Sequence, residues 1–133
     1  MKMAVKREEI PFESLLGKTL TEIRVAQDKE SMTLVDSEGA LYEFYHEQDC
    51  CESVYIDDIC GDLDDLKGYP ILIAEEETNE QDTSEEEDHN DLVVWTFYKM
   101  STMKGSVTIR WYGGSNGYYS VGVNFDRVTD NGV

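Results

Sequence analysis

Apolar and polar residues alternate with a period of two along much of this chain, and this period favours β-strands over helices. The alternation is most regular at 93–98 and 107–112, where every second residue is apolar or aromatic. Eight segments show this alternation or a short apolar run between turn residues: 21–25, 32–34, 41–45, 53–56, 70–74, 93–98, 107–112 and 119–125. The run at 70–74 is predicted to be buried on both faces.

These segments predict a mostly β (α+β) fold, in which about eight strands form an antiparallel sheet that is curled or two-layered. The first three strands are separated by short turns, which indicates a meander. Connectors at 103–105 and 113–117 predict further hairpins, and the tail after Arg127 is expected to be loose. A chain of 133 residues falls within the usual size of one domain, so we expect a single domain over 1–133.

One or two short helices complete this prediction. Residues 8–17 suit a helical lead-in, because Pro11 fits a first helical position and Gly17 fits the stop. Residues 61–68 suit a helix of one or two turns that begins at Asp62, a residue type favoured at the N-cap.

The charge of the chain is concentrated in one third of its length. Between Glu47 and Asp91 there are 18 acidic residues and one base, Lys67, a net charge of −17 out of −18 for the whole chain. The other 88 residues hold 11 acids and 10 bases. Like charges repel one another, so stability alone does not call for this polarisation. A pI near 4.2 argues against direct binding to nucleic acid or to an anionic membrane, and we expect a basic partner.

The acidic third has two parts. In residues 75–91, ten of the 17 residues are acidic and none is basic, which predicts a solvated, disordered loop. The segment 47–65 is different, because apolar residues such as Val54, Ile56 and Leu63 should tie it to the fold. We expect its acids to contact the partner: Glu47, Asp49, Glu52, Asp57, Asp58, Asp62, Asp64 and Asp65. Acids held in this way could imitate the phosphate spacing of a duplex or contact an arginine-rich groove.

A cluster of cysteine, histidine and carboxylates around residues 46–65 invites a metal hypothesis. Its weak candidate ligands are His46, Cys50, Cys51 and Cys60, but zinc sites usually contain a pair such as C-x₂₋₄-C, which is absent from this sequence. An EF-hand loop beginning at Asp62 also fails, because it would place Lys67 at the glycine position. No metal and no cofactor is therefore predicted.

The sequence contains no catalytic signature, such as a phosphate loop or G-x-S-x-G, so we predict no catalytic residues and no enzyme. Three cysteines, two of them adjacent, are a poor disulfide framework and predict reduced thiols. The N-terminal residues do not resemble a signal peptide, and no apolar run is long enough to span a membrane. These features predict a cytoplasmic protein.

The run 43–66 has a specific core, H-x-Q-D-C-C-E-x-V-x-I-D-D-I-x-G-D-L-x-D-L, at residues 46–66. It resembles a family of small uncharacterised proteins of bacteriophages and mobile elements. The resemblance extends over most of residues 17–125 and includes Gly17–Leu20, the 71–74 strand and the Thr96-Phe97-Tyr98 strand. The family has no assigned activity, so no functional residue follows from it. The resemblance implies a phage accessory protein that acts in the cytoplasm of a bacterial host.

Together these observations predict a non-enzymatic acidic protein that binds a basic, nucleic-acid-binding surface of a host or phage protein. Such a protein would serve as a counter-defence inhibitor or a DNA mimic, an expectation that rests on analogy. Two alternatives stay open. One is a β-domain that binds a small ligand or metal through the region of His46 and the cysteines, and the other is a structural component of a virion or of its assembly.

Overall fold

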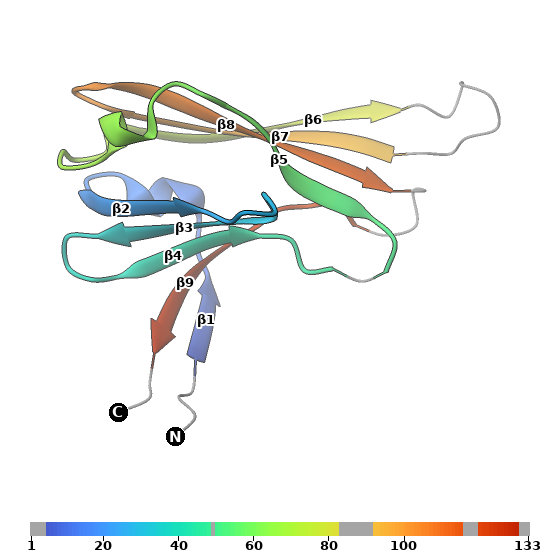
Figure 1. The fold of residues 1–133 in the computed structure, drawn as a ribbon, viewed down its shortest axis with the longest axis horizontal. Coiled ribbons are helices and arrows are strands. Elements are labelled where there is room, and N and C mark those ends of the chain that lie inside the picture. The colour runs from blue at the N-terminus through green and yellow to red at the C-terminus, as the bar shows by residue number, and fades with distance from the viewer. Residues whose placement is uncertain (1–4, 49, 83–91, 116–119, 131–133) are drawn as a thin grey trace.

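The computed structural model describes residues 5–48, 50–82, 92–115 and 120–130. In these residues nine strands form two antiparallel sheets that lie over one another (Figure 1). The five-stranded sheet has the order β1-β9-β4-β3-β2 and consists of Val5–Glu9, Asn124–Asp130, Leu41–Tyr45, Ser31–Asp36 and Leu20–Val25. The four-stranded sheet has the order β5-β8-β7-β6 and consists of Ser53–Cys60, Gly105–Ser115, Leu92–Thr102 and Ile73–Asp82. The predicted two-layered, mostly β fold is confirmed.

Both predicted helices are present as short 3₁₀ helices, η1 (Phe12–Leu15) and η2 (Leu63–Leu66), and no α-helix occurs in the described residues. Each begins with an i→i+3 hydrogen bond, from Ser14 to the Pro11 carbonyl and from Asp65 to the Asp62 carbonyl, at 3.0 Å in both cases. The segments are too short for a stable α-helix, and short runs favour the tighter helix. The lead-in prediction was wrong at its start, because residues 8 and 9 belong to β1.

The meander β2–β3–β4 forms as predicted, with Leu34 opposite both Ile23 and Tyr42. Its second turn is organised by Asp36, which is buried although it is charged. The Asp36 carboxylate accepts hydrogen bonds from the amides of Glu38 and Ala40, each at 2.9 Å, and from the Tyr42 hydroxyl at 3.0 Å. Burial alone would raise the pKa of Asp36, but these hydrogen bonds outweigh it and lower that pKa below its usual value of 3.8.

Residues 75–82 lie in β6 and pair with β7, with Glu76 opposite Tyr98, so the prediction of a loop was wrong for this part. The composition of these residues alone favours a solvent-exposed loop. Their long antiparallel pairing with the aromatic strand β7 stabilises them as a strand instead. Residues 83–91 lie outside the described residues. The prediction that residues 70–74 are buried on both faces was also wrong. Ile73 is 44% exposed on the uncovered outer face of the edge strand β6, and Leu72, which precedes that strand, is 61% exposed.

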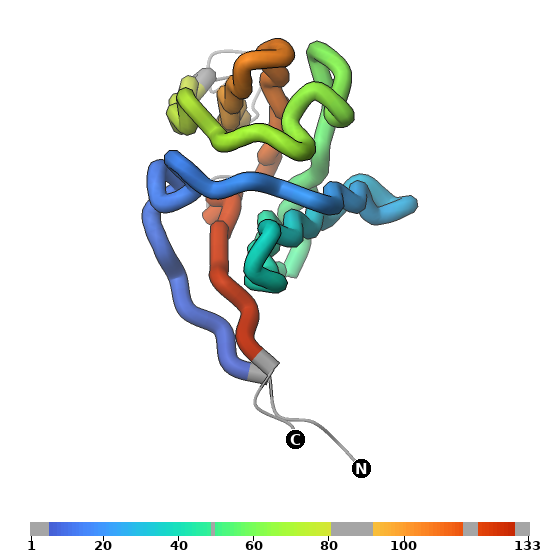
Figure 2. The backbone as a smooth tube through the Cα atoms, turned by 90° about the vertical axis from the view of Figure 1, so that its left-hand side faces the viewer, coloured from blue at the N-terminus to red at the C-terminus, as the bar shows by residue number. Residues whose placement is uncertain are grey.

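The last strand does not form the predicted hairpin with β8. Gly113 to Ser115 extend β8, and the chain then crosses to the five-stranded sheet, where β9 pairs with β4 and β1. The crossing passes close to Gly113, where an added Cβ would lie 2.7 Å from the carbonyl oxygen of Val121. The prediction of a loose tail after Arg127 was wrong for residues 128–130, which pair with residues 5–7, and residues 131–133 lie outside the described residues. Figure 2 shows β1 and β9 side by side, extending away from the four-stranded sheet.

An aromatic cluster fills the space between the sheets. Phe12 of η1, Phe44 of β4, Tyr98 of β7 and Phe125 of β9 are all buried. Their ring centroids lie 4.7 Å apart for Phe44–Tyr98 and Phe44–Phe125 and 4.9 Å apart for Phe12–Tyr98. These tilted and edge-to-face arrangements are the ones that aromatic pairs favour. Because the four rings come from four elements, the cluster holds both sheets and η1 together.

The buried Asp36 carboxylate yields a prediction about stability and pH. Asp36→Asn removes the charge that its three donors stabilise, so at pH 7 the free energy of unfolding should fall by about 1–2 kcal/mol. Because the pKa of Asp36 is lower in the folded state than in the unfolded state, this contribution is present above the unfolded value and is lost as the pH falls through the folded value. Urea unfolding from pH 7 to about pH 2 should therefore show the gap between wild type and variant shrinking below about pH 4.

The matched control is Glu38→Gln, which changes an exposed acid of the same turn. It should alter the stability by less than about 0.5 kcal/mol. A gap between wild type and Asp36→Asn that stays constant down to the lowest pH would contradict the role assigned to this carboxylate.

Candidate functional site

The two edge strands of the four-stranded sheet carry its acids, and the central hairpin carries its bases. Residues 50–82, which include β5, η2 and β6, contain 11 acids and one base, Lys67. Residues 92–115, which form β7 and β8, contain Lys99, Lys104 and Arg110 and no acid. We call the acids at β5 and η2 the β5 rim (Asp57, Asp58, Asp62, Asp64 and Asp65) and the acids of β6 whose side chains are described the β6 edge (Glu75, Glu76, Glu77 and Glu80). Nine of the 18 acids between Glu47 and Asp91 thus lie along the two edges of one sheet.

The central bases hold part of each acidic edge. Lys99 donates to Glu77 of the β6 edge at 3.1 Å. Arg110 donates from Nε to Asp57 Oδ2 at 2.9 Å and from a second guanidinium nitrogen to the same oxygen. The Arg110 guanidinium also lies over the ring of Trp95, 5.2 Å from its centroid. These contacts of the central bases neutralise one acid on each edge.

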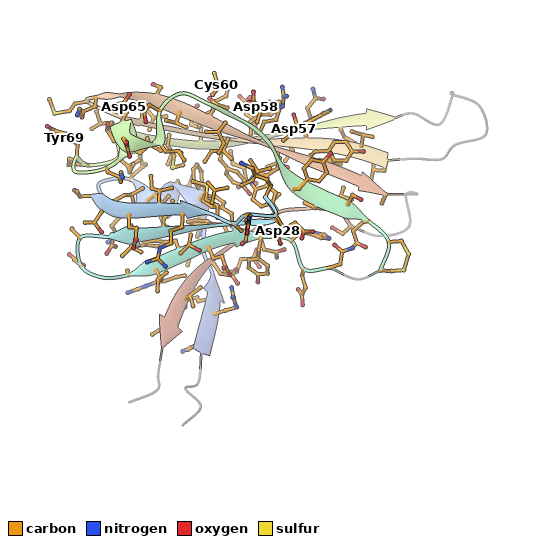
Figure 3. All side chains as sticks on the ribbon, in the orientation of Figure 1. Asp28, Asp57, Asp58, Cys60, Asp65 and Tyr69 are labelled. Carbon is orange, nitrogen blue, oxygen red and sulfur yellow. A yellow bond between two sulfur atoms is a disulfide. The ribbon has the colours of Figure 1, made fainter. Side chains whose placement is uncertain are left out.

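The remaining acids of the β5 rim have distinct surroundings. Asp58 is exposed, and Figure 3 shows it beside Asp57 and Cys60 on β5, with Asp65 farther along on η2. Asp62 caps η2 by accepting a hydrogen bond from the Asp64 amide at 2.9 Å, as the sequence predicts. Asp64 lies 2.7 Å from Lys67, and this pairing lowers the pKa of the Asp64 carboxyl. Two of the five rim acids are therefore in ion pairs.

Three residues predicted to contact a partner lie before β5. Glu47 is exposed, and Asp49 lies outside the described residues. Glu52 is 4% exposed, so its prediction as part of an exposed acidic face was wrong. The alternation of β5 explains its burial, because Glu52 precedes the inward-facing Val54 and Ile56 and points to the same side.

Glu52 and His46 form a buried pair. Their side chains are 0% and 6% exposed, and His46 Nε2 lies 2.9 Å from Glu52 Oε2. His46 Nδ1 donates to the Gly122 carbonyl oxygen at 2.6 Å, since a carbonyl can only accept. The Cys50 amide donates to Glu52 Oε1 at 2.9 Å, and the Gln48 side chain donates to the Glu52 carbonyl at 2.7 Å. Both ring nitrogens of His46 are therefore engaged within the protein.

The four candidate metal ligands do not converge. His46 is engaged as described, Cys50 and Cys51 are joined by a disulfide, and Cys60 is an exposed free thiol on β5. No group of three or more potential metal ligands is found among the described residues. The expectation of reduced thiols was wrong for Cys50 and Cys51. These residues lie in a bend before β5, where side chains need not alternate between opposite faces as they do in a strand.

The sequence analysis did not predict that the acids of β6 belong to a folded strand at the edge of a sheet. It also did not predict the pairing of Glu77 in this strand with the central base Lys99. The available signal was Lys99 in an aromatic strand, since a base in such a strand needs an acidic neighbour or solvent. It also missed the buried pair of His46 and Glu52. An acid two residues before a buried strand position, as Glu52 is before Val54, could have indicated burial.

The fold and the distribution of charge define an antiparallel two-sheet β-protein with acidic sheet edges. The chain belongs to the family described as a domain of unknown function, DUF7448, whose model matches residues 13–125. No curated protein and no solved structure matches the chain significantly. The family match confirms the predicted membership of an uncharacterised family. Within the described residues, no helix has the length and apolar character that crossing a membrane would require.

The buried pair yields a second prediction. Glu52→Ala leaves the Cys50 amide without its acceptor and His46 Nε2 without its hydrogen-bond partner, and leaving a buried polar group unpaired typically costs about 1–3 kcal/mol. We expect the free energy of unfolding in urea to fall by about that amount for each of the two groups. The control Glu47→Ala changes an exposed acid nearby and should cost less than about 0.5 kcal/mol. Equal effects of the two substitutions would show that Glu52 has no such role.

Proposed function

We propose that this protein is a non-enzymatic acidic binding protein that docks on a basic surface of a partner protein. The observation that carries the proposal is the excess of carboxylates on the two edges of the four-stranded sheet. Six of them form no ion pair with another described residue: Asp58, Asp62, Asp65, Glu75, Glu76 and Glu80. Acids held on a folded sheet keep their spacing, which favours a partner with a matching array of lysine and arginine side chains.

A charged sheet edge also has a simpler role, because acids on an exposed edge strand prevent it from pairing with other chains. This role accounts for some acids of β6 and β5. It does not account for Asp65, which lies in η2 and not on a strand edge, whereas Asp62 has a separate role as the N-cap of η2. Asp65 therefore supports docking over edge protection alone.

We further propose that the partner is a nucleic-acid-binding protein of a bacteriophage or its host, and that the protein acts in the host cytoplasm. The basis is the resemblance of residues 43–66 to proteins of phages and mobile elements, together with the acidity of the chain. Proteins that bind nucleic acid present basic surfaces, and an acidic protein can occupy them. Inhibition by occupying such a surface requires no enzymatic step.

The proposal predicts that partner binding depends strongly on salt. A partner captured from host lysate should be purified and titrated against this protein between about 0.05 M and 0.3 M salt, where the Debye length falls from roughly 14 Å to 6 Å. We expect the affinity to fall by about tenfold or more, mainly through slower association. An affinity that stays constant over this range would exclude docking through the acidic edges.

Charge-neutral variants then locate the surface. Asp58→Asn with Asp65→Asn tests the β5 rim, and Glu75→Gln with Glu80→Gln tests the β6 edge. Glu30→Gln with Glu38→Gln is the matched control, because it removes two exposed acids from the turns of the five-stranded sheet. Replacing residues 83–91 with a short glycine-serine linker measures how much that acidic segment contributes to the affinity for the partner. Equal loss of affinity in the control would point to net charge and not to the sheet edges.

A further inference from the structure

A groove opens between the two sheets where η1 lies against β6. It consists of two adjoining cavities of about 370 Å³ and 380 Å³, which share Pro11, Phe12 and Glu76 in their walls. Val123 and Phe125 add apolar surface to one cavity, and Ala74 adds it to the other. We call this feature the Glu76 groove.

The rim of the Glu76 groove is acidic. Glu9, Glu13 and Glu76 line the two cavities together with Glu75, whose side chain alternates toward the outer face of β6, and no basic residue lines either cavity. None of the four forms an ion pair with another described residue. An apolar floor with an unbalanced carboxylate rim is complementary to a cation on an apolar stem.

Glu76 differs from the other acids of the β6 edge. It shares the inward face of β6 with the buried Ala74, whereas Glu75 and Glu77 point to the outer face. Glu76 is exposed, but the groove walls desolvate its carboxylate in part, and this partial desolvation raises its pKa. A cation beside Glu76 would compensate this loss of solvation.

A second polar group near Glu76 also lacks a partner. Tyr98 lies directly opposite Glu76 in the β6–β7 register, is fully buried, and has no hydrogen bond to its hydroxyl among the described residues. Its ring packs edge-to-face against Phe12, whose side chain lines both cavities. Burial, together with the charge of Glu76, raises the pKa of Tyr98. Buried hydroxyls normally have partners, so Tyr98 adds an uncompensated polar group behind the groove wall, close to Glu76, although it lines neither cavity.

We propose that the Glu76 groove binds a lysine or arginine side chain of the partner. The aliphatic stem would contact Pro11, Phe12 and Val123, and the cationic end would donate to the Glu76 carboxylate. This inference rests on the proposed function for the identity of the occupant. The site itself can be tested without the partner, so its failure and that of the proposed function can be told apart.

The test is a titration of the isotope-labelled full chain with n-hexylammonium, followed by amide chemical shifts. We expect saturable shifts at Phe12, Ala74 and Glu76, together with a fall in the measured pKa of the Glu76 carboxyl as the cation binds. Methylammonium carries the charge without the stem, and 1-hexanol carries the stem without the charge. Each should bind about tenfold more weakly, because the site uses both contacts. Hexylguanidinium compares an arginine-like end with the lysine-like one.

Glu76→Gln removes the charge and keeps the shape, and should weaken hexylammonium binding by about tenfold. Glu77→Gln is the matched control, because it changes the charge of the same strand on the opposite face and should leave binding within about twofold. Equal effects of Glu76→Gln and Glu77→Gln, or hexanol binding as tightly as hexylammonium, would overturn the proposal.

Discussion

The aromatic cluster between the sheets is the interaction on which the rest of the fold depends. Phe12, Phe44, Tyr98 and Phe125 come from η1, β4, β7 and β9, so no single hairpin can bury them. Phe125 reaches the cluster only because the chain leaves β8 after Ser115 and crosses to the other sheet. Burial of four aromatic side chains outweighs the local preference for a hairpin between neighbouring strands. The same cluster brings η1 against β6 and so creates the Glu76 groove.

The placement of charge follows from this arrangement of layers. The central strands β7 and β8 have neighbours on both sides, and residues 92–115 contain three bases and no acid. Acids lie on the edges, where Asp57 and Glu77 each reach one central base and the others face solvent. Opposite charges on adjacent strands attract one another, whereas two acidic strands side by side would repel. The sheet therefore tolerates a large excess of acid only by separating its acidic strands with a basic hairpin.

The sequence predicts the strands that alternate apolar and polar residues, as β2, β3, β4, β7 and β8 do. It fails where tertiary contacts override composition. Residues 75–82 have the composition of a solvated loop, yet the long pairing with β7 makes them a strand. The partner of the last strand cannot be read from local pattern, because it depends on where Phe125 is buried. For the site, the acidic segment 57–65 is correctly placed at the surface, but Glu52 is not, since its burial with His46 requires knowledge of a contact with Gly122.

The acids of β6 cannot all be explained by protection of an exposed edge. Glu75 and Glu77 point to the outer face, where water or Lys99 solvates them at little cost. Glu76 points toward the Glu76 groove, where partial desolvation disfavours its charged form although the residue is exposed. A cation held beside this carboxylate would restore the solvation that the groove walls remove. The electrostatics of the free state therefore favour binding of a basic side chain at Glu76 itself, and not merely general attraction to the acidic edge.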